Sequence, residues 1–243
     1  MEREIGDAGE FLNNSVATRA VNIEPDMGRV ARFDSYHRRY RSLLLGIGLA
    51  GLGLLGLGIG LWRIHHQLWG SVALLPALLL LWFASRLPQT LRGDAYRNGL
   101  LVPGIVSSLE PLTVTCLANV RADGEDDIPV GRPYWGVRQV AAPQLPLHAA
   151  RLGEQVPCVS LFGPVSQDEC VYTLFEPRPL SWGAANEQVI TQARAAIDAE
   201  EWAMLPRLVA AFAGAEKSSD DIAYFDPALN PVRPPDAAEK TEG

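Results

Sequence analysis

Two long apolar blocks dominate the hydrophobic pattern of the chain. They cover residues 43–62 and 68–87, and a short polar break that contains Arg63 separates them. Each block is about 20 residues long, the length at which a helix crosses roughly 30 Å of hydrocarbon. A long helix in a soluble core would show a polar face, and neither block has one. The pattern predicts a membrane α-helical hairpin of two transmembrane helices.

One face of the first predicted span consists of small residues. Gly46, Ala50, Gly53, Gly56 and Gly60 fall within about 120° of one another at 100° per residue. Such a face lets another helix approach closely, so we expect helix–helix packing there. The other half of the hairpin is the first partner to expect, and a homodimer or another membrane protein is the alternative.

Beyond the spans the pattern changes from continuous to alternating, as in half-buried strands. Short apolar runs separated by turn-rich stretches indicate five strands, at residues 100–107, 112–120, 135–141, 156–162 and 171–175. Helical spacing returns after Asn186 and again after Asp198, and Pro206 is expected to bend or restart the second helix. The sequence therefore predicts a soluble α+β domain: a small antiparallel five-stranded sheet, or partly open barrel, with C-terminal helices.

These patterns divide the chain into four parts. Residues 1–28 are expected to form a mobile tail, and residues 29–97 an interfacial lead-in with the two-span hairpin. Residues 98–213 form the predicted soluble domain. Residues 214–243 are rich in Ser, Asp, Pro, Glu and Lys, which predicts a disordered tail.

The charge is distributed unevenly along the chain. Residues 1–97 carry 11 basic and 8 acidic residues, whereas residues 98–243 carry 10 basic and 20 acidic residues. An acidic domain argues against nucleic acid as a partner, and against broad contact with anionic lipid.

Arginines flank the outer ends of both apolar blocks, and the break between the blocks offers only Arg63. The positive-inside rule therefore places both termini in the cytoplasm. The prediction is a two-span protein of the inner (cytoplasmic) membrane with the lipid bilayer as its first partner.

Four motifs of the predicted domain suggest a family. They are Leu-Val-Pro-Gly-Ile-Val at 101–106, Tyr-Trp-Gly-Val-Arg at 134–138, Gly-Glu-Gln-Val-Pro-Cys-Val at 153–159 and Pro-Leu-Ser-Trp-Gly at 179–183. In these motifs the chain resembles a family of small actinobacterial, corynebacterial-type membrane proteins that carry a C-terminal domain of unknown function. The resemblance implies two spans ahead of the domain. It implies no activity and no site residues.

Catalytic chemistry has few candidates in this sequence. His148 is the one histidine of the predicted domain, so a Ser-His or Cys-His device has a single possible base. An enzyme would need a cluster around His148, Arg138 and Glu154. The adjacent His65 and His66 do not point at one centre on a helix, so we expect no metal site and no cofactor. The sequence favours a protein that is not an enzyme.

Aromatic and arginine residues near the strand ends are the remaining candidates for binding. Tyr134, Trp135, Arg138, Arg178 and Trp182 could frame a ligand or peptide groove, since small open sheets bind along an exposed face or edge. The competing interpretation makes both tryptophans core residues and both arginines their solvent-facing neighbours.

These observations lead to a membrane-anchored cytoplasmic interaction or accessory module, acting on a membrane or envelope complex or as a homodimer through the glycine face. The alternative is a ligand-sensing membrane protein that binds a small molecule or peptide on the β-domain. An unrecognised enzyme is the third reading.

Overall fold

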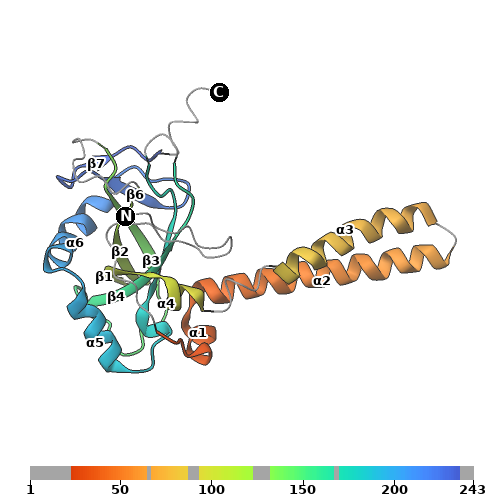
Figure 1. Cartoon of the computed structure of the whole chain (residues 1–243), viewed down its shortest axis with the longest axis horizontal. Helices are drawn as coiled ribbons and strands as arrows, with labels where there is room; N and C mark the ends of the chain where they lie inside the picture. Colours follow the sequence, from red (N-terminus) through yellow and green to blue (C-terminus); the bar gives the residue numbers. More distant parts are fainter. Residues whose placement is uncertain (1–22, 65–66, 87–92, 123–131, 167–169, 236–243) are drawn as a thin grey trace, which may run out of the picture.

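The two apolar blocks form a helical hairpin that projects from the rest of the molecule (Figure 1). The computed structural model describes residues 23–64, 67–86, 93–122, 132–166 and 170–235. In it, α2 (Ser35–Arg63) and α3 (Gln67–Arg86) lie side by side. By length and composition α2 is the one described helix that could cross a membrane, and the apolar part of α3, Ser71–Trp82, is shorter. The hairpin is present, and its second span stays a prediction.

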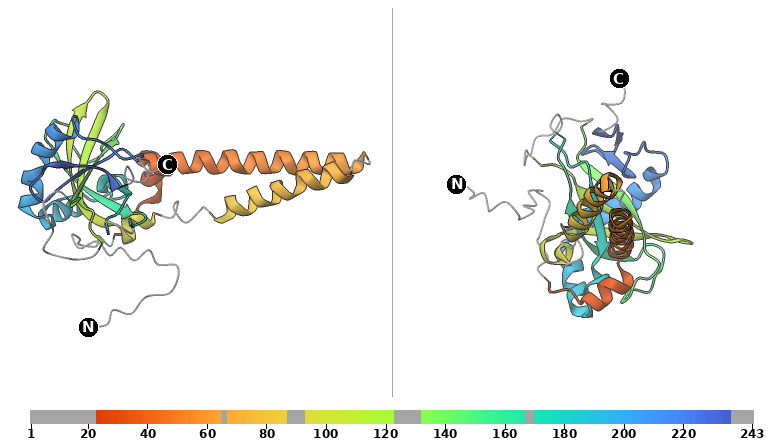
Figure 2. Two further views of the ribbon diagram at one scale, coloured as in Figure 1. Left: turned by 90° about the horizontal axis from the view of Figure 1, so that it is seen from above. Right: turned by 90° about the vertical axis from the view of Figure 1, so that its right-hand side faces the viewer.

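The hairpin closes through glycines other than those of the predicted face. Gly51 and Gly58 are buried in α2, and a Cβ atom at Gly51 would lie 3.0 Å from Leu81 Cγ of α3. Ala77 of α3 is fully buried on the other side of this contact. At 100° per residue Gly51 and Gly58 lie roughly opposite the predicted glycine face. Figure 2 shows α3 running along one side of α2.

The domain is built on one antiparallel sheet of seven strands, two more than predicted, in the order β5-β4-β1-β2-β3-β6-β7. The strands are β1 (Leu100–Leu109), β2 (Leu112–Asn119), β3 (Trp135–Ala141), β4 (Gln155–Phe162), β5 (Phe175–Pro179), β6 (Ile222–Phe225) and β7 (Pro231–Val232). The first four match the prediction closely, because each has a run of apolar positions that is as long as a strand and bounded by turn-forming residues. The fifth begins at Phe175, where the predicted strand ended.

The sheet curls on itself without closing. Beyond β2, the Tyr172 amide donates to the Val120 carbonyl at 2.7 Å, so the chain before β5 lies beside the end of β2. A side chain also reaches across, since Arg138 of β3 donates to the Phe175 carbonyl of β5. The strand order of the described residues still ends at β5 and β7, so the barrel remains open.

Apolar side chains form two clusters, one on each face of the curled sheet. The larger cluster contains the largest fully buried side chains, among them Trp182, Tyr96 and Phe175. The smaller cluster lies under α6 (Ala199–Phe212), whose Leu205 and Leu208 are fully buried. The prediction of C-terminal helices beside the sheet is confirmed. Helix α6 continues through Pro206, so the helix does not restart there, and the expected bend stays a prediction.

The predicted disordered tail is wrong over β6 and β7. All four residues of β6 are fully buried, and β6 pairs with β3 from Trp135↔Phe225 to Arg138↔Ile222. The strand is four residues long and flanked by acidic and proline-rich sequence, so its apolar run was too short to register as an element. Residues 236–243 of the predicted tail lie outside the described residues.

The domain also includes residues ahead of the hairpin, before its predicted start at residue 98. Part of the predicted mobile tail contacts the domain, since the Asp26 amide donates to the Gly183 carbonyl at 2.9 Å. In α1 (Met27–Phe33) Val30 is buried in the larger cluster, and so is Tyr96 of α4 (Asp94–Asn98). The hairpin is therefore inserted into the domain, which takes core residues from both sides of it. Residues 1–22 lie outside the described residues.

Candidate functional site at the base of the hairpin

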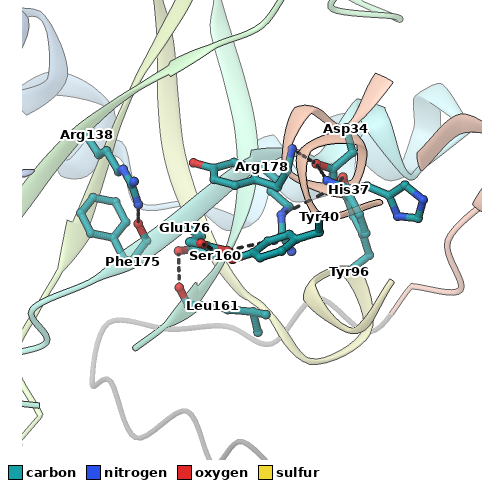
Figure 3. Close-up of polar contacts among 11 residues, drawn as sticks. Asp34, His37, Tyr40, Tyr96, Arg138, Ser160, Leu161, Phe175, Glu176 and Arg178 are labelled. Carbon is teal, nitrogen blue, oxygen red and sulfur yellow. Dashed lines mark hydrogen bonds and ion pairs between the residues drawn. The ribbon is translucent and has the colours of Figure 1, made fainter. Parts of the chain in front are cut away.

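The candidate site is the buried polar junction between α2 and the sheet, and Asp34 is its central residue (Figure 3). Asp34 separates α1 from α2, and its Oδ1 accepts from the amides of Tyr36 at 2.8 Å and His37 at 3.1 Å. These bonds cap α2, because the first amides of a helix have no partner within it. The other oxygen, Oδ2, accepts from the Tyr96 hydroxyl at 3.1 Å. One carboxylate thus starts the hairpin and joins it to α4.

Arg178 of β5 supplies the opposite charge. Its side chain is 3% exposed, its Nε lies 3.6 Å from Asp34 Oδ2, and its Nη2 donates to Glu176 Oε2 at 3.0 Å. The guanidinium also lies 4.9 Å from the centre of the Tyr36 ring, a cation–π contact. Burial pulls the pKa of Arg178 down, but the carboxylates of Asp34 and Glu176 outweigh it, so the pKa lies above its ordinary value. The arginine is permanently charged.

The tyrosines of the junction stay protonated. Burial, and then the carboxylate of Asp34, raises the pKa of Tyr96 well above its usual range. One and a half turns into α2, the Tyr40 hydroxyl donates to Glu176 Oε1 at 3.2 Å. Glu176 therefore accepts from β5 and from α2 at once. The first two turns of α2 are held on the sheet by charge and hydrogen bonds.

The arm that precedes α2 is fixed to the same part of the domain. Arg29 Nη2 donates to the Ser181 carbonyl at 3.0 Å, in the short helix η2 (Leu180–Trp182) that follows β5. Behind this contact the Tyr96 ring lies against Gly183, where an added Cβ would come within 2.6 Å of the ring. A side chain at Gly183 would push Tyr96 away from Asp34.

Three of the five residues of the predicted groove lie at the start of β3 or along it, and the other two, Arg178 and Trp182, are buried. Tyr134 and Trp135 form an edge-to-face pair, with ring centres 4.8 Å apart, at the start of β3. Arg138 lies further along β3 and binds the Phe175 carbonyl. Trp182 is fully buried and donates to the Gln144 carbonyl at 2.9 Å, and Arg178 is buried in the junction. Trp182 is thus a core residue, as the competing interpretation has it, while Arg178 does not face solvent.

The predicted glycine face of α2 is open. No atom lies within 4 Å of a Cβ placed at Gly46, Gly53, Gly56 or Gly60, and Ala50 is exposed. Helix α3 covers Gly51 and Gly58 instead. The hairpin's own second half does not fill the predicted face, so packing there against another chain stays a prediction.

The enzyme reading required a cluster, and two of its three residues meet. His148 Nδ1 lies 3.0 Å from Glu154 Oε1, and Glu154 also accepts from the amides of Ala149 and Arg151. Burial lowers the pKa of His148 more than Glu154 raises it. Backbone hydrogen bonds, together with His148, hold the pKa of Glu154 below its ordinary value despite burial. Arg138 contacts β5 elsewhere, so Glu154 closes a loop and the predicted triad does not assemble.

Two thiols face each other across strand β1. Cys116 of β2 and Cys158 of β4 are fully buried, with sulfur atoms 3.6 Å apart, and both are free. They flank Gly104 of β1, whose missing side chain leaves the space that Cys158 Sγ occupies. Among the described residues no cluster of three or more His, Cys, Asp or Glu could hold a metal ion. His65 and His66 lie outside the described residues.

Sequence reasoning missed the centre of the junction, although a signal for it exists. Asp34 is the only acidic residue between Asp26 and Asp94, in a stretch that holds eight arginines. A single carboxylate beside a membrane span needs a buried cation or a structural role. Its partners Tyr96 and Arg178 are far away in sequence, and their contact with Asp34 could not be found from local spacing.

These features define a class of protein, an α+β domain with a helical hairpin inserted ahead of its sheet. Residues 91–212, half of the chain, match the family described as "Protein of unknown function (DUF3239)". The chain belongs to this family, which confirms the resemblance seen in the sequence. The match leaves out the arm before the hairpin and both strands β6 and β7.

A solved structure is similar to part of the chain. It is described as "Crystal structure of a putative membrane protein from Corynebacterium diphtheriae", is 20% identical, and aligns over 50% of this chain and 97% of its own length with a TM-score of 0.43. No curated protein matches the chain.

Proposed function

We propose that the protein is a two-span anchor of the cytoplasmic membrane that presents an interaction module, with both termini in the cytoplasm, to a membrane or envelope complex. The observation that carries the proposal is the buried junction of Asp34, Tyr96 and Arg178 between hairpin and sheet. It makes the hairpin a fixed part of the domain and not a flexible tether.

The depth of the polar contacts supports the anchor. They end at Tyr40, and the uncharged part of α2 begins at Leu43. From there to Arg63 the helix rises about 30 Å at 1.5 Å per residue, close to the thickness of the hydrocarbon core. Trp62 and Trp69, exposed near the far end of the hairpin, suit the opposite interface.

The rigidity of the junction supports a role in interaction. Moving α2 relative to β5 would separate a buried ion pair, which costs about 3–5 kcal/mol when one partner is left alone. A partner that binds the hairpin in the membrane therefore acts on the domain as well. We place that partner, a second copy or another membrane helix, on the open face of Gly46, Ala50, Gly53, Gly56 and Gly60.

The ligand-sensing alternative would be favoured by a closed pocket between the sheet and the terminal helices. One pocket among the described residues lies at the base of the hairpin, away from the terminal helices, and its volume is about 90 Å³. Sites for small organic ligands are roughly 300–1,000 Å³, so this pocket does not support binding of such a ligand at the base of the hairpin. We propose no enzyme activity, because His148 and Glu154 meet without Arg138.

The experiment is co-purification of the full-length chain in mild detergent, with topology reporters at both termini. The variant is Gly53→Leu/Gly56→Leu, and the control is Val72→Leu, which adds bulk at an exposed position of α3. The proposal expects a stoichiometric membrane partner or a dimer that the glycine variant loses and the control keeps. It fails if the termini lie outside the cytoplasm, or if a small molecule but no protein stays with the chain.

A further inference from the structure

A small basic pocket lies beside the junction. It is lined by Arg32 and Phe33 at the end of α1, Arg38 of α2, and Pro143 and Gln144 of the loop between β3 and β4. The volume of about 90 Å³ admits a group of the size of a phosphate and excludes a cofactor.

The protein leaves the charge of this pocket uncompensated. Within the part of the chain that the structure describes, Arg32 and Arg38 form no salt bridge, and both side chains are exposed. The nearest acidic residue in sequence is Asp34, which already binds Tyr96 and faces Arg178. Guanidinium groups bind phosphate oxygens through charge-assisted hydrogen bonds, in a geometry that lysine does not offer.

A contact with an aromatic side chain holds each wall of the pocket. The Arg32 guanidinium lies 5.2 Å from the centre of the Phe33 ring, which limits its freedom. On the other wall the fully buried Trp182 binds the carbonyl of Gln144 and fixes the loop. A preformed pocket loses less conformational entropy on binding than a mobile one.

The pocket lies at the depth of lipid headgroups. Arg38 precedes Leu43 by five residues, so it lies about 7.5 Å below the start of the apolar span. The polar layer on each side of a bilayer is about 5–7.5 Å thick, from a total of 40–45 Å around a 30 Å core, so Arg38 lies at the outer edge of this layer once α2 is inserted as proposed. Figure 1 shows α1 at the domain end of α2, where the hairpin leaves the domain.

We propose that this pocket binds the phosphate of an anionic phospholipid headgroup in the cytoplasmic leaflet. The inference rests on the proposed insertion of α2 in the membrane. It assigns the lipid contact to one site, which accommodates the acidic character of the remaining domain surface. Bound lipid would fill the corner between α1 and α2 and brace the junction from its membrane side.

The test measures lipid binding to the full-length chain in mild detergent by native mass spectrometry. Phosphatidylglycerol, phosphatidylcholine and inorganic phosphate are titrated separately. We expect phosphatidylglycerol to bind more tightly than phosphatidylcholine, and Arg32→Gln or Arg38→Gln to weaken it about tenfold, equivalent to about 1.4 kcal/mol. The matched control is Arg39→Gln, which removes the neighbouring charge without touching the pocket and should bind as the wild type does.

Two results would overturn the inference. Equal weakening by Arg39→Gln would mean diffuse attraction to the arginine cluster and no site. Binding of inorganic phosphate with the same dependence on Arg38 would make the ligand a soluble phosphate and not a lipid. Alkaline extraction of membranes tests the anchor separately: if the lipid-binding result fails and the wild-type chain still resists extraction, the proposed function stands without the lipid site. Release of the wild-type chain would overturn both.

Discussion

The two ends of α2 are held in opposite ways. Its first turns meet the sheet and α4 through a buried carboxylate, a buried guanidinium and two tyrosine hydroxyls. The rest packs along α3 at Gly51 and Gly58, with a hydrogen bond from Trp62 to Ser71 near the tip of the hairpin. Buried charges are stable only when every partner is present, so the base of the helix has one geometry. Glycine contacts depend on close approach alone and leave the other face of the helix free. The base of α2 is therefore fixed in one geometry, whereas the apolar part of the helix leaves one face open to another helix.

The largest test of this contrast removes the carboxylate at the base. Asp34→Ala removes the cap of α2, the acceptor of the Tyr96 hydroxyl and the carboxylate beside Arg178 Nε, and it leaves Arg178 with Glu176 alone. We expect about 3 kcal/mol of lost stability in denaturant unfolding of the detergent-solubilised chain, the lower end of the cost of breaking a buried ion pair. Asp26→Ala is the control, since Asp26 caps α1 in the same way through the amides of Gly28 and Arg29 but is exposed. It should cost about 1 kcal/mol, the cap alone.

Removing both charges of the pair tests the same assignment from the other side. Asp34→Ala/Arg178→Met should recover part of the lost stability, because a buried ion pair is often replaced by apolar groups at little cost. Equal losses for Asp34→Ala and Asp26→Ala would mean that Asp34 acts only as a cap.

The next test compares two glycines of α2 that face opposite ways. Gly51→Leu should push α3 away, since even a Cβ there lies 3.0 Å from Leu81 Cγ and 3.5 Å from the Ala77 carbonyl oxygen. Overpacking of this kind costs about 1–3 kcal/mol. Gly53→Leu meets open space and should leave the thermal stability of the monomer unchanged. Similar loss of monodisperse protein on heating for both variants would remove the distinction between the faces.

A smaller effect tests how far the polar contacts extend along α2. Tyr40→Phe removes one partly buried hydrogen bond to Glu176, worth about 0.5–1.5 kcal/mol. The control is Tyr134→Phe, because the Tyr134 hydroxyl has no hydrogen bond to any residue that the structure describes. Thermal unfolding of the two variants side by side measures the difference, and identical midpoints would place the end of the junction before Tyr40.

The elements that the sequence predicted are those whose apolar pattern is visible within a short stretch of chain. The hairpin and the first four strands follow from runs and alternations within about ten residues, and those contacts exist as expected. Strand β6 failed because its burial comes from β3 and α6 and not from its own length. Trp182 and Arg178 of the predicted groove are buried by contacts with residues far from them in sequence, Gln144 and, ahead of the hairpin, Asp34, which local patterns do not reveal.

The smallest predicted effect concerns the loop that the enzyme reading singled out. The pKa of His148 is lowered in the fold from its usual 6.5, so the unfolded chain takes up a proton first as the pH falls. Stability should therefore decrease from about pH 6.5 downward until His148 also protonates in the fold. The carboxylate of Glu154 limits this loss and Arg194 increases it. The pKa of Glu154 is itself lowered in the fold, so the stability that its carboxylate provides is lost only as the pH falls below about its ordinary value of 4.5.

His148→Gln should flatten the stability curve between about pH 7 and pH 5 and leave partner binding intact. Chemical denaturation at both pH values measures the slope, and co-purification measures the partner. Parallel slopes for variant and wild type would mean that His148 titrates normally. Loss of function with unchanged stability would instead give His148 the chemical role that its position on a closed loop, apart from Arg138, argues against.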